Sequence, residues 1–180
     1  MIKTYVIDTN VLIQAPYAIE CFEENNLVLP LVVLEELDGL KKAEGEKGAN
    51  ARAAVRKLES YRQKGDLLQG VKLPGGGILR IEKNFVQVEL PQDIPDDKPD
   101  NRILKVCKGL AETEKEGQVI LVTKDIVLRL KAQILGIRAE DFERERISED
   151  DAQYTGRMEI YFPEEKVKEF KKKCIPLTDA

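Results

Sequence analysis

Residues 118–125 read QVILVTKD, and this stretch decides the fold. Its run from Val119 to Val122 is apolar without alternation, which is typical of a parallel strand buried on both faces. The amphipathic stretch DIVLRLKAQILG (125–136) follows at once and predicts a capped helix that ends at Gly136. A buried strand followed directly by a helix predicts a parallel α/β architecture.

The rest of the chain repeats this alternation of strands and helices. Further strands are expected at residues 2–7, 27–30 and 137–141, and helices at residues 11–16, 18–25, 31–43, 51–65 and 101–117. A charged, glycine-bearing loop is expected at 43–50. Two alternating runs, 78–82 and 85–90, follow the glycines 75–77 and predict a β-hairpin insertion within residues 70–90. The order of elements predicts a parallel α/β sandwich.

Length and composition bound the domain organisation and the location. A chain of 180 residues with 42% apolar content predicts one domain, residues 1–147, followed by an arm or linker, residues 148–180, with a strand-like run and a lysine-rich helix. No apolar run approaches the ~20 residues of a membrane span. The first residues, MIKTYVID, read as a strand and not as a signal peptide, so we expect a cytoplasmic location and no membrane partner. Three widely spaced cysteines without a CxxC pair indicate reduced thiols.

Four carboxylates lie at the edges of apolar runs. They are Asp8 at the end of TYVID, Glu36 within LVVLEELDGL, Asp100 at the start of DNRILKVCKGL and Asp125 in VILVTKD. Parallel α/β folds gather the carboxyl ends of their strands around one crevice. Four acids gathered there would repel one another unless a divalent metal ion were bound between them. We therefore expect all four to be catalytic residues and metal ligands.

Each acid also has a simple structural explanation. Asp8 and Asp125 could each cap a helix N-terminus, because Asp accepts bonds from free backbone N–H groups. Asp100 could favour a helix dipole from the first turn. Glu36 could be an ordinary solvated helix residue.

Helical geometry weakens the last two explanations. Glu36 falls roughly 70° from the centre of the apolar stripe on its helix, whereas Glu35 falls nearly opposite. Asp100 projects onto the apolar side of the later helix. That side consists of Ile103, Cys107, Leu110 and Ala111. A core-facing carboxylate is costly to desolvate without a cation, which is either a metal ion or a buried Lys or Arg.

The chain contains no histidine, which excludes Ser-His-Asp and Cys-His catalysis and histidine-ligated zinc. Oxygen ligands suit Mg²⁺ or Mn²⁺. Either ion can activate water without a histidine base. The short polar side chains of Thr9, Asn10 and Thr123 are expected to orient the carboxylates as a second shell. Ordinary turn chemistry is the alternative for these three residues.

A basic tract stands out although the formal net charge of the chain is −4. Residues 41–64 hold eight Lys or Arg and three Glu. The tract could be a solvated helix face, or it could follow a phosphate backbone without reading sequence. The residues expected to bind RNA are Lys41, Lys42, Lys47, Arg52 and Arg56. The chain has no GxxxxGK[ST] motif, so the sequence predicts no phosphate-binding P-loop.

At these residues the chain resembles the PIN-domain family of metal-dependent ribonucleases. The segments VIDTNVLI, VVLEELDGL, DNRIL and LVTKDIVLRLKA resemble the four acid motifs of that family, in order. The resemblance covers residues 1 to about 147. It implies a three-layer α/β/α sandwich with a twisted, mainly parallel sheet, and it places the family acids on Asp8, Glu36, Asp100 and Asp125.

Within the family, the chain is most similar to the N-terminal PIN domain of PhoH-like proteins. The glycine-bearing insertion, GIRAEDFERERI (136–147) and YTG (154–156) carry this likeness. Such proteins usually continue into a P-loop ATPase domain linked to RNA unwinding, which these 180 residues lack. The resemblance therefore implies an ATPase partner in a longer parent chain, and assembly into dimers or larger rings.

Together these features predict a Mg²⁺- or Mn²⁺-dependent endoribonuclease that hydrolyses single-stranded RNA with metal-activated water. The alternative is a non-catalytic RNA-binding or assembly module that serves a PhoH-like ATPase. A phosphotransfer hydrolase with Asp8 as nucleophile is a weaker alternative, because such enzymes usually carry a second Asp where this chain has Asn10.

Overall fold

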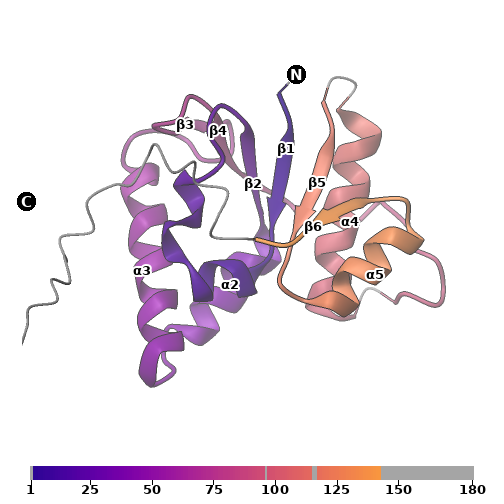
Figure 1. Ribbon diagram of the computed structural model, residues 1–180, viewed down its shortest axis with the longest axis horizontal. Helices are drawn as coiled ribbons and strands as arrows, with labels where there is room; N and C mark the ends of the chain where they lie inside the picture. Colours follow the sequence, from indigo (N-terminus) through magenta and orange to yellow (C-terminus); the bar gives the residue numbers. More distant parts are fainter. Residues whose placement is uncertain (1, 96, 115–116, 143–180) are drawn as a thin grey trace, which may run out of the picture. The chain divides into compact units, whose positions relative to one another are not determined.

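The computed structural model covers residues 1–180, and the structure describes residues 2–95, 97–114 and 117–142 (Figure 1). These residues belong to one compact unit, Met1–Arg144. The strand-like run and the lysine-rich helix expected within 148–180 lie outside the described residues. Within the described part of the chain, no helix is long and apolar enough to span a bilayer.

Six strands of the described residues form one sheet in the order β3-β4-β2-β1-β5-β6. The strands are β1 (Thr4–Ile7), β2 (Asn26–Pro30), β3 (Val71–Lys72), β4 (Ile78–Glu82), β5 (Val119–Val122) and β6 (Arg138–Glu140). All neighbouring pairs are parallel except β3 and β4. Every residue of β1 and β5 is buried, which explains why both strands read as continuous apolar runs. The predicted mainly parallel α/β sheet is confirmed.

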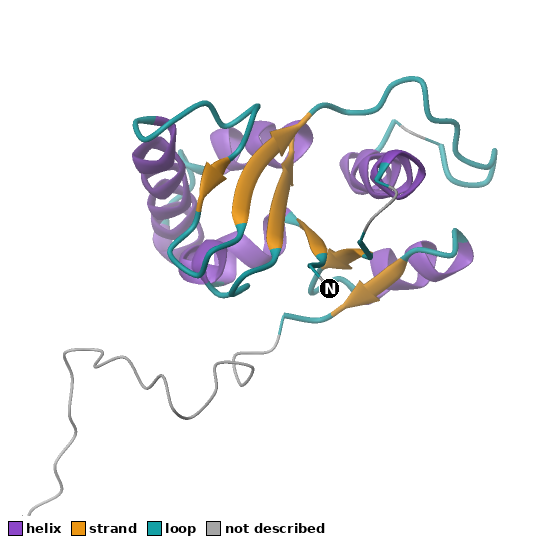
Figure 2. Ribbon diagram, turned by 90° about the horizontal axis from the view of Figure 1, so that it is seen from above, coloured by secondary structure: helices purple, strands orange, loops and turns teal. Residues whose placement is uncertain are grey.

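The helices cover both faces of this sheet. They are α1 (Thr9–Gln14), the short 3₁₀ helix η1 (Pro16–Glu20), α2 (Leu31–Leu40), α3 (Gly45–Arg62), α4 (Pro99–Thr113) and α5 (Ile126–Ile134). The chain runs from β1 through β2 to β4 in one direction across the sheet and returns to β5 and β6 in the other. Because such crossovers are right-handed, the helices of the two halves lie on opposite faces. Figures 1 and 2 show α3 and α4 on opposite sides of the sheet.

The strand order reverses between β1 and β5, which pair directly with each other. Here one crossover leaves toward β2 and the other toward β6, so the connections diverge at the carboxyl ends of β1 and β5. Ligands of open α/β sheets bind in the crevice at such a switch point. The residues that follow these two strands are Asp8 and Thr123.

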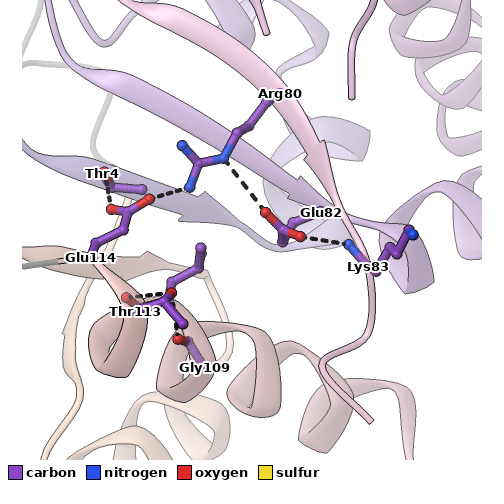
Figure 3. A network of polar contacts seen from close by, with 8 residues as sticks. Thr4, Arg80, Glu82, Lys83, Gly109, Thr113 and Glu114 are labelled. Atoms are coloured by element: carbon purple, nitrogen blue, oxygen red, sulfur yellow. Dashed lines mark hydrogen bonds and ion pairs between the residues drawn. The ribbon is translucent and has the colours of Figure 1, made fainter. Parts of the chain in front are cut away.

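A polar network fixes the far end of α4 against the sheet (Figure 3). Glu114, directly after α4, accepts a hydrogen bond of 2.9 Å from the Thr4 hydroxyl and forms an ion pair with Arg80 of β4. Glu82 lies 3.6 Å from the other side of the same guanidinium. The network joins β1, β4 and α4 at the end of α4 that is opposite to Asp100. It therefore holds the helix that carries the third acid.

A β-hairpin lies within residues 70–90 as predicted, but its two strands are not the predicted ones. The antiparallel pair consists of β3 and β4, and the three glycines 75–77 lie in the turn between these strands. Residues 85–90 form no strand. Phe85 instead adopts a positive φ of 44° and lays its ring over Gly109 of α4. Within this run Phe85 packs on α4 and Val88 is buried, whereas Val86 is exposed.

Three local predictions are also wrong. The segment 43–50 is not a loop, because α3 begins at Gly45. A Cβ atom on Gly48 would lie 1.8 Å from the carbonyl oxygen of Ala43, so glycine lets the first turn of α3 approach the end of α2. The helix expected at 18–25 is the shorter η1, and Ala111, expected in the buried stripe of α4, is exposed.

Candidate metal centre at the carboxyl ends of β1 and β5

Asp8 is the most buried of the four predicted acids, with 4% of its surface exposed. Its backbone N–H donates to the carbonyl of Val122, 3.0 Å away, which continues the pairing of β1 with β5. Asp8 occupies the N-cap position of α1, but its side chain accepts no capping bond. The capping explanation therefore fails for Asp8, and its carboxylate faces the switch point.

The environment of Asp8 favours the protonated carboxyl. Its pKa is raised from 3.8 to about 6, chiefly by burial and also by the charges of Asp100 and Glu36, against the lowering effect of a hydrogen bond from Thr123. Two of the other predicted acids therefore act on Asp8 electrostatically. The charge of Asp8 also adds to the burial that raises the pKa of Cys107 of α4, beside it.

Thr123 and Asn10 connect the two strand ends. The Thr123 hydroxyl donates to Asp8 over 2.5 Å and accepts from the backbone N–H of Asp125 over 3.0 Å. The Asn10 amide donates to the same hydroxyl over 3.2 Å and accepts from the backbone N–H of Lys124 over 3.0 Å. These bonds fix the rotamer of Asp8 and the turn after β5 together.

Glu36 reaches the same region from α2. It is half-buried, whereas Glu35 is exposed, as the helical geometry predicts. Its carboxylate accepts a hydrogen bond from the hydroxyl of Thr9, the residue after Asp8. Thr9 thereby links the second acid to the first.

Asp100 lies half-buried in the first turn of α4. The next residue, Asn101, is 2% exposed and was not predicted to matter. Its amide donates to the carbonyl of Pro95 over 2.6 Å, and its oxygen accepts from the Lys131 ammonium of α5 over 2.9 Å. Asn101 thus ties the loop before α4, the start of α4 and α5 together beside Asp100.

Asp125 behaves differently from the other three acids. It is the N-cap of α5, and its side chain accepts from the backbone N–H groups of Val127 and Leu128, 2.7 and 3.3 Å away. The capping explanation therefore holds for Asp125 in this arrangement. Its place beside Thr123 keeps it next to Asp8 in the bonded network.

The donor chemistry fits a hard divalent cation, since the candidate ligands are carboxylates and hydroxyls without histidine. Among the described residues, however, no three acids or cysteines are arranged as they would be around a metal ion. The carboxylates of Asp8, Glu36 and Asp125 are each hydrogen-bonded to a neighbour. Binding of a metal ion by these carboxylates would replace these hydrogen bonds.

One more acid lies at the carboxyl end of a parallel strand, and the sequence reasoning missed it. Asp141 directly follows β6 and lies 3.2 Å from the ammonium of Lys124 and 3.4 Å from the guanidinium of Arg129. The signal was present, because IRAED ends in an acid as TYVID does. One of these ion pairs holds Lys124, the residue between Thr123 and Asp125.

The basic tract divides into two kinds of residue. Lys41 forms an ion pair with Asp38, and the Arg52 guanidinium donates to the carbonyls of Lys41 and Ala43, 2.8 and 3.4 Å away. Arg52 therefore closes the end of α2. Of the five described residues expected to bind RNA, Lys42, Lys47 and Arg56 are exposed and have no such bond.

The parallel sheet and the carboxylates at its switch point place this chain among α/β proteins with a candidate divalent-metal site. The chain belongs to the PIN domain family, whose family model matches residues 5–143. Proteins of this family are generally metal-dependent nucleases.

The relatives agree with this assignment. The chain is 46% identical over 170 residues to protein PhoH2 of Bacillus subtilis (strain 168), covering 92% of this chain and 38% of that protein. It is 38% identical over 160 residues to protein PhoH2 of Thermobispora bispora, covering 88% and 35%. The chain thus spans less than two fifths of the length of these relatives, between 35% and 38%.

One solved structure shares the fold. It is a domain of a functionally unknown protein from Methanocaldococcus jannaschii, with a TM-score of 0.50 and 21% identity. The match covers 78% of this chain and 91% of that chain. At this identity the likeness concerns the fold alone.

Proposed function

We propose that this domain is a Mg²⁺- or Mn²⁺-dependent endoribonuclease that hydrolyses single-stranded RNA. The observation that carries the proposal is the buried carboxylate of Asp8, whose pKa is raised to about 6 by burial and by the charges of Asp100 and Glu36. Uncompensated acids at a sheet switch point are stabilised by a divalent cation. Membership in a family of generally metal-dependent nucleases supports the same reading.

Each acid has a proposed role. Asp8 and Asp125 are the main metal ligands, and Glu36 and Asp100 complete the site directly or through water. Thr9 and Thr123 hold the carboxylates of Glu36 and Asp8, and Asn10 holds Thr123. A bound Mg²⁺ or Mn²⁺ would supply an acidified water for attack at neutral pH and would balance charge on the phosphate.

The substrate and partners follow from the remaining surface and from the relatives. Lys42, Lys47 and Arg56 are proposed to contact the RNA backbone, with Lys41 and Arg52 holding the local structure that presents them. The relatives are longer than this chain, so we propose a parent chain with an ATPase domain, acting in the cytoplasm.

Cleavage of a fluorescent single-stranded RNA in Mn²⁺ tests this function. Asp8→Asn and Glu36→Gln are expected to abolish cleavage, and excess EDTA should do the same to the parent. Glu35→Gln is the matched control, because Glu35 lies on the same helix but is exposed. Equal cleavage by the parent and Asp8→Asn would reject the assignment.

A binding measurement separates the metal site from the chemistry. Mn²⁺ is expected to raise the melting temperature of the parent, because a ligand that binds the folded state stabilises it. Asp8→Asn should lose most of this shift, and Glu35→Gln should keep it. The same shift in Asp8→Asn and the parent would place the ion elsewhere.

A non-catalytic RNA-binding module is the second candidate. The observation in its favour is that no three acids of the described residues are arranged around a common metal position. It would be supported by tight RNA binding in Mn²⁺ with no cleavage product after prolonged incubation of the parent.

A further inference from the structure

A hollow of about 260 Å³ lies between α5 and β6, which are neighbours in Figure 1. Its lining includes Ile126, Arg129, Leu130 and Gln133 of α5, and Ile137 and Arg138 on the opposite side. The α5 residues follow the i, i+3, i+4, i+7 pattern of a single helix face. The lining therefore combines aliphatic side chains with two guanidinium groups and one amide.

The hollow opens next to the candidate metal centre. Asp141 connects the two places, since it forms ion pairs with Arg129 of the lining at 3.4 Å and with Lys124 at 3.2 Å. Lys124 is the residue before Asp125, one of the four proposed metal ligands. From the first to the last of these lining positions α5 rises by about 10 Å, at 1.5 Å per residue. A nucleotide in the hollow would thus be close in the strand to a phosphate at the metal centre.

The rim of the hollow is positively charged, although the chain carries a net charge of −4. The Asp141 carboxylate is shared by Lys124 and Arg129. Glu140 pairs with Arg138 at 3.0 Å. These pairs join three cations to two carboxylates, which leaves one positive charge without a counter-charge in this group. Because the two Asp141 pairs exceed the roughly 2.7–2.9 Å of a close charge-assisted hydrogen bond, Lys124 and Arg129 can also bind a phosphate.

The aliphatic lining suits a base better than it suits a second phosphate. Ile126 and Leu130 are 62% and 55% exposed, so their side chains are available to a ligand. RNA bases that leave the stack pack on apolar side chains and guanidinium planes, and their edges form hydrogen bonds. The Gln133 amide offers both donors and an acceptor for such an edge. The volume lies below the roughly 300 Å³ at which pockets for drug-sized ligands begin, so the hollow suits a single base.

We propose that the hollow binds one unstacked nucleotide of the RNA strand. Lys124 and Arg129 bind its phosphate. Its base packs on Leu130 and Ile137, with its edge toward Gln133. This assignment rests on the proposed function, because it places the nucleotide beside the site of cleavage. It adds a second RNA contact to that of the basic tract.

Fluorescence anisotropy with a labelled single-stranded RNA in EDTA tests the site on the 180-residue chain without cleavage. Leu130→Asp places a carboxylate in the hollow and should weaken binding on the order of tenfold, the effect of losing one packed base. Ile134→Asp is the matched control, because Ile134 is 75% exposed on the same helix and lies outside the lining. It makes the same change in net charge and should leave the affinity close to that of the parent.

Arg129→Ala tests the phosphate contact in the same assay. A phosphate contact contributes about 0.7 to the slope of log affinity against log salt, so this variant should flatten the slope by that amount. An unchanged slope would contradict a phosphate at Arg129.

A cross-linking measurement locates the base. RNA that carries 4-thiouridine should, on irradiation, label tryptic peptides from residues 126–138 of the parent. The label on these peptides should fall in Leu130→Asp and persist in Ile134→Asp. The measurement on the parent needs no variant, so it decides the matter even if a substitution disturbs folding. Far-UV circular dichroism should show the same helix content in every variant.

The outcomes separate the nucleotide site from the proposed function. Unchanged affinity in Leu130→Asp, an equal loss in Ile134→Asp, or cross-links confined to the basic tract would overturn the nucleotide site. The exposed aliphatic lining would then be a contact for another protein. A parent that binds RNA through the hollow but does not cleave it in Mn²⁺ would instead support the nucleotide site and overturn the proposed function.

Discussion

Asp8 directly follows β1 and Asp125 lies three residues after the end of β5, and both precede a helix, yet they differ in the contacts they make. The Asp125 carboxylate accepts hydrogen bonds from free backbone N–H groups at the start of α5. Asp8 accepts a hydrogen bond from the Thr123 hydroxyl and makes no capping bond to α1. The sequence left capping open for both, because the pattern of a strand, an acid and a helix is the same. The two acids are distinguished only by Thr123, whose hydroxyl donates to Asp8.

The pKa of Asp8 predicts an unusual stability effect. In the folded state the pKa is about 6, against 3.8 as the ordinary value. Below 3.8 the carboxyl is protonated in both states and has no effect, whereas above 6 the folded state is disfavoured by about 3 kcal/mol. In EDTA, Asp8→Asn should therefore gain stability over the parent as pH rises from 4 to 6, and keep that gain to pH 8.

Equilibrium unfolding in urea at pH 4 and pH 8 measures this difference. Asp125→Ala serves as the contrast, because loss of an N-cap is expected to cost about 1 kcal/mol. If Asp8→Asn were less stable than the parent at pH 8, the carboxylate would be satisfied by groups other than those described.

Asn101 shows what sequence reasoning could not reach. The acid before it was found because helical periodicity placed Asp100 on the buried side of α4. The partners of Asn101, the Pro95 carbonyl and the Lys131 ammonium, come from a loop and from a helix 30 residues away. Side-chain pairing over such a separation leaves no periodic signal.

Asn101→Ala should lower the free energy of unfolding by about 1–3 kcal/mol, because it leaves buried polar groups without partners. Gln133→Ala on α5 is the control, since Gln133 is exposed, and its effect should stay within about 0.5 kcal/mol. Urea unfolding at pH 7 compares them. Equal stability of Asn101→Ala and the parent would mean that water replaces both bonds.

At the scale of elements, strands and helices could be predicted where a single pattern of apolar residues extends over the whole segment. β1, β5 and α5 follow from their apolar patterns. Residues 85–90 were wrongly assigned to a strand because they alternate as a strand does, while Phe85 takes a left-handed conformation to cover Gly109. The start of α3 was missed because its glycines read as a loop. In both cases the deciding contact is with another element.

Two glycines in helices should respond to alanine in opposite ways. A Cβ atom on Gly109 would lie 2.1 Å from the Phe85 ring, whereas a Cβ atom on Gly39 of α2 meets nothing within 4 Å. Gly109→Ala should destabilise the fold by about 1–3 kcal/mol through overpacking. Gly39→Ala should stabilise it by up to about 1 kcal/mol, because alanine favours helix. Urea unfolding of both variants decides, and a stabilising Gly109→Ala would show that the ring moves freely.

At the scale of the molecule, the sheet order brings the acids together. Asp8 directly follows β1, whereas Glu36 and Asp100 lie on α2 and α4, and their charges reach Asp8 because the chain crosses back at the switch point. The four acids could be proposed from the sequence, since strand ends converge in every parallel α/β fold. The strand order could not be derived from local patterns, because it depends on which crossovers pack against which helices.

The charge distribution of the whole molecule gives the last prediction. The chain carries a net charge of −4, so RNA affinity must depend on a local basic surface. In EDTA, which prevents metal-dependent cleavage, affinity for single-stranded RNA should fall as salt rises. Each phosphate contact contributes about 0.7 to the slope of log affinity against log salt. Lys47→Ala combined with Arg56→Ala should therefore flatten the slope by about 1.4.

Arg52→Ala is the discriminating variant, because it lies on the same helix as Arg56. Its guanidinium is bound to the carbonyls of Lys41 and Ala43, so it should contribute to stability and leave the salt slope unchanged. Fluorescence anisotropy with a labelled RNA measures the slope, and urea unfolding measures the stability. A slope that changes for Arg52→Ala and not for the double variant would reverse the assignment. It would show that the capping arginine leaves its carbonyls to bind phosphate, because a guanidinium bound to those two carbonyls has little capacity left for an RNA backbone.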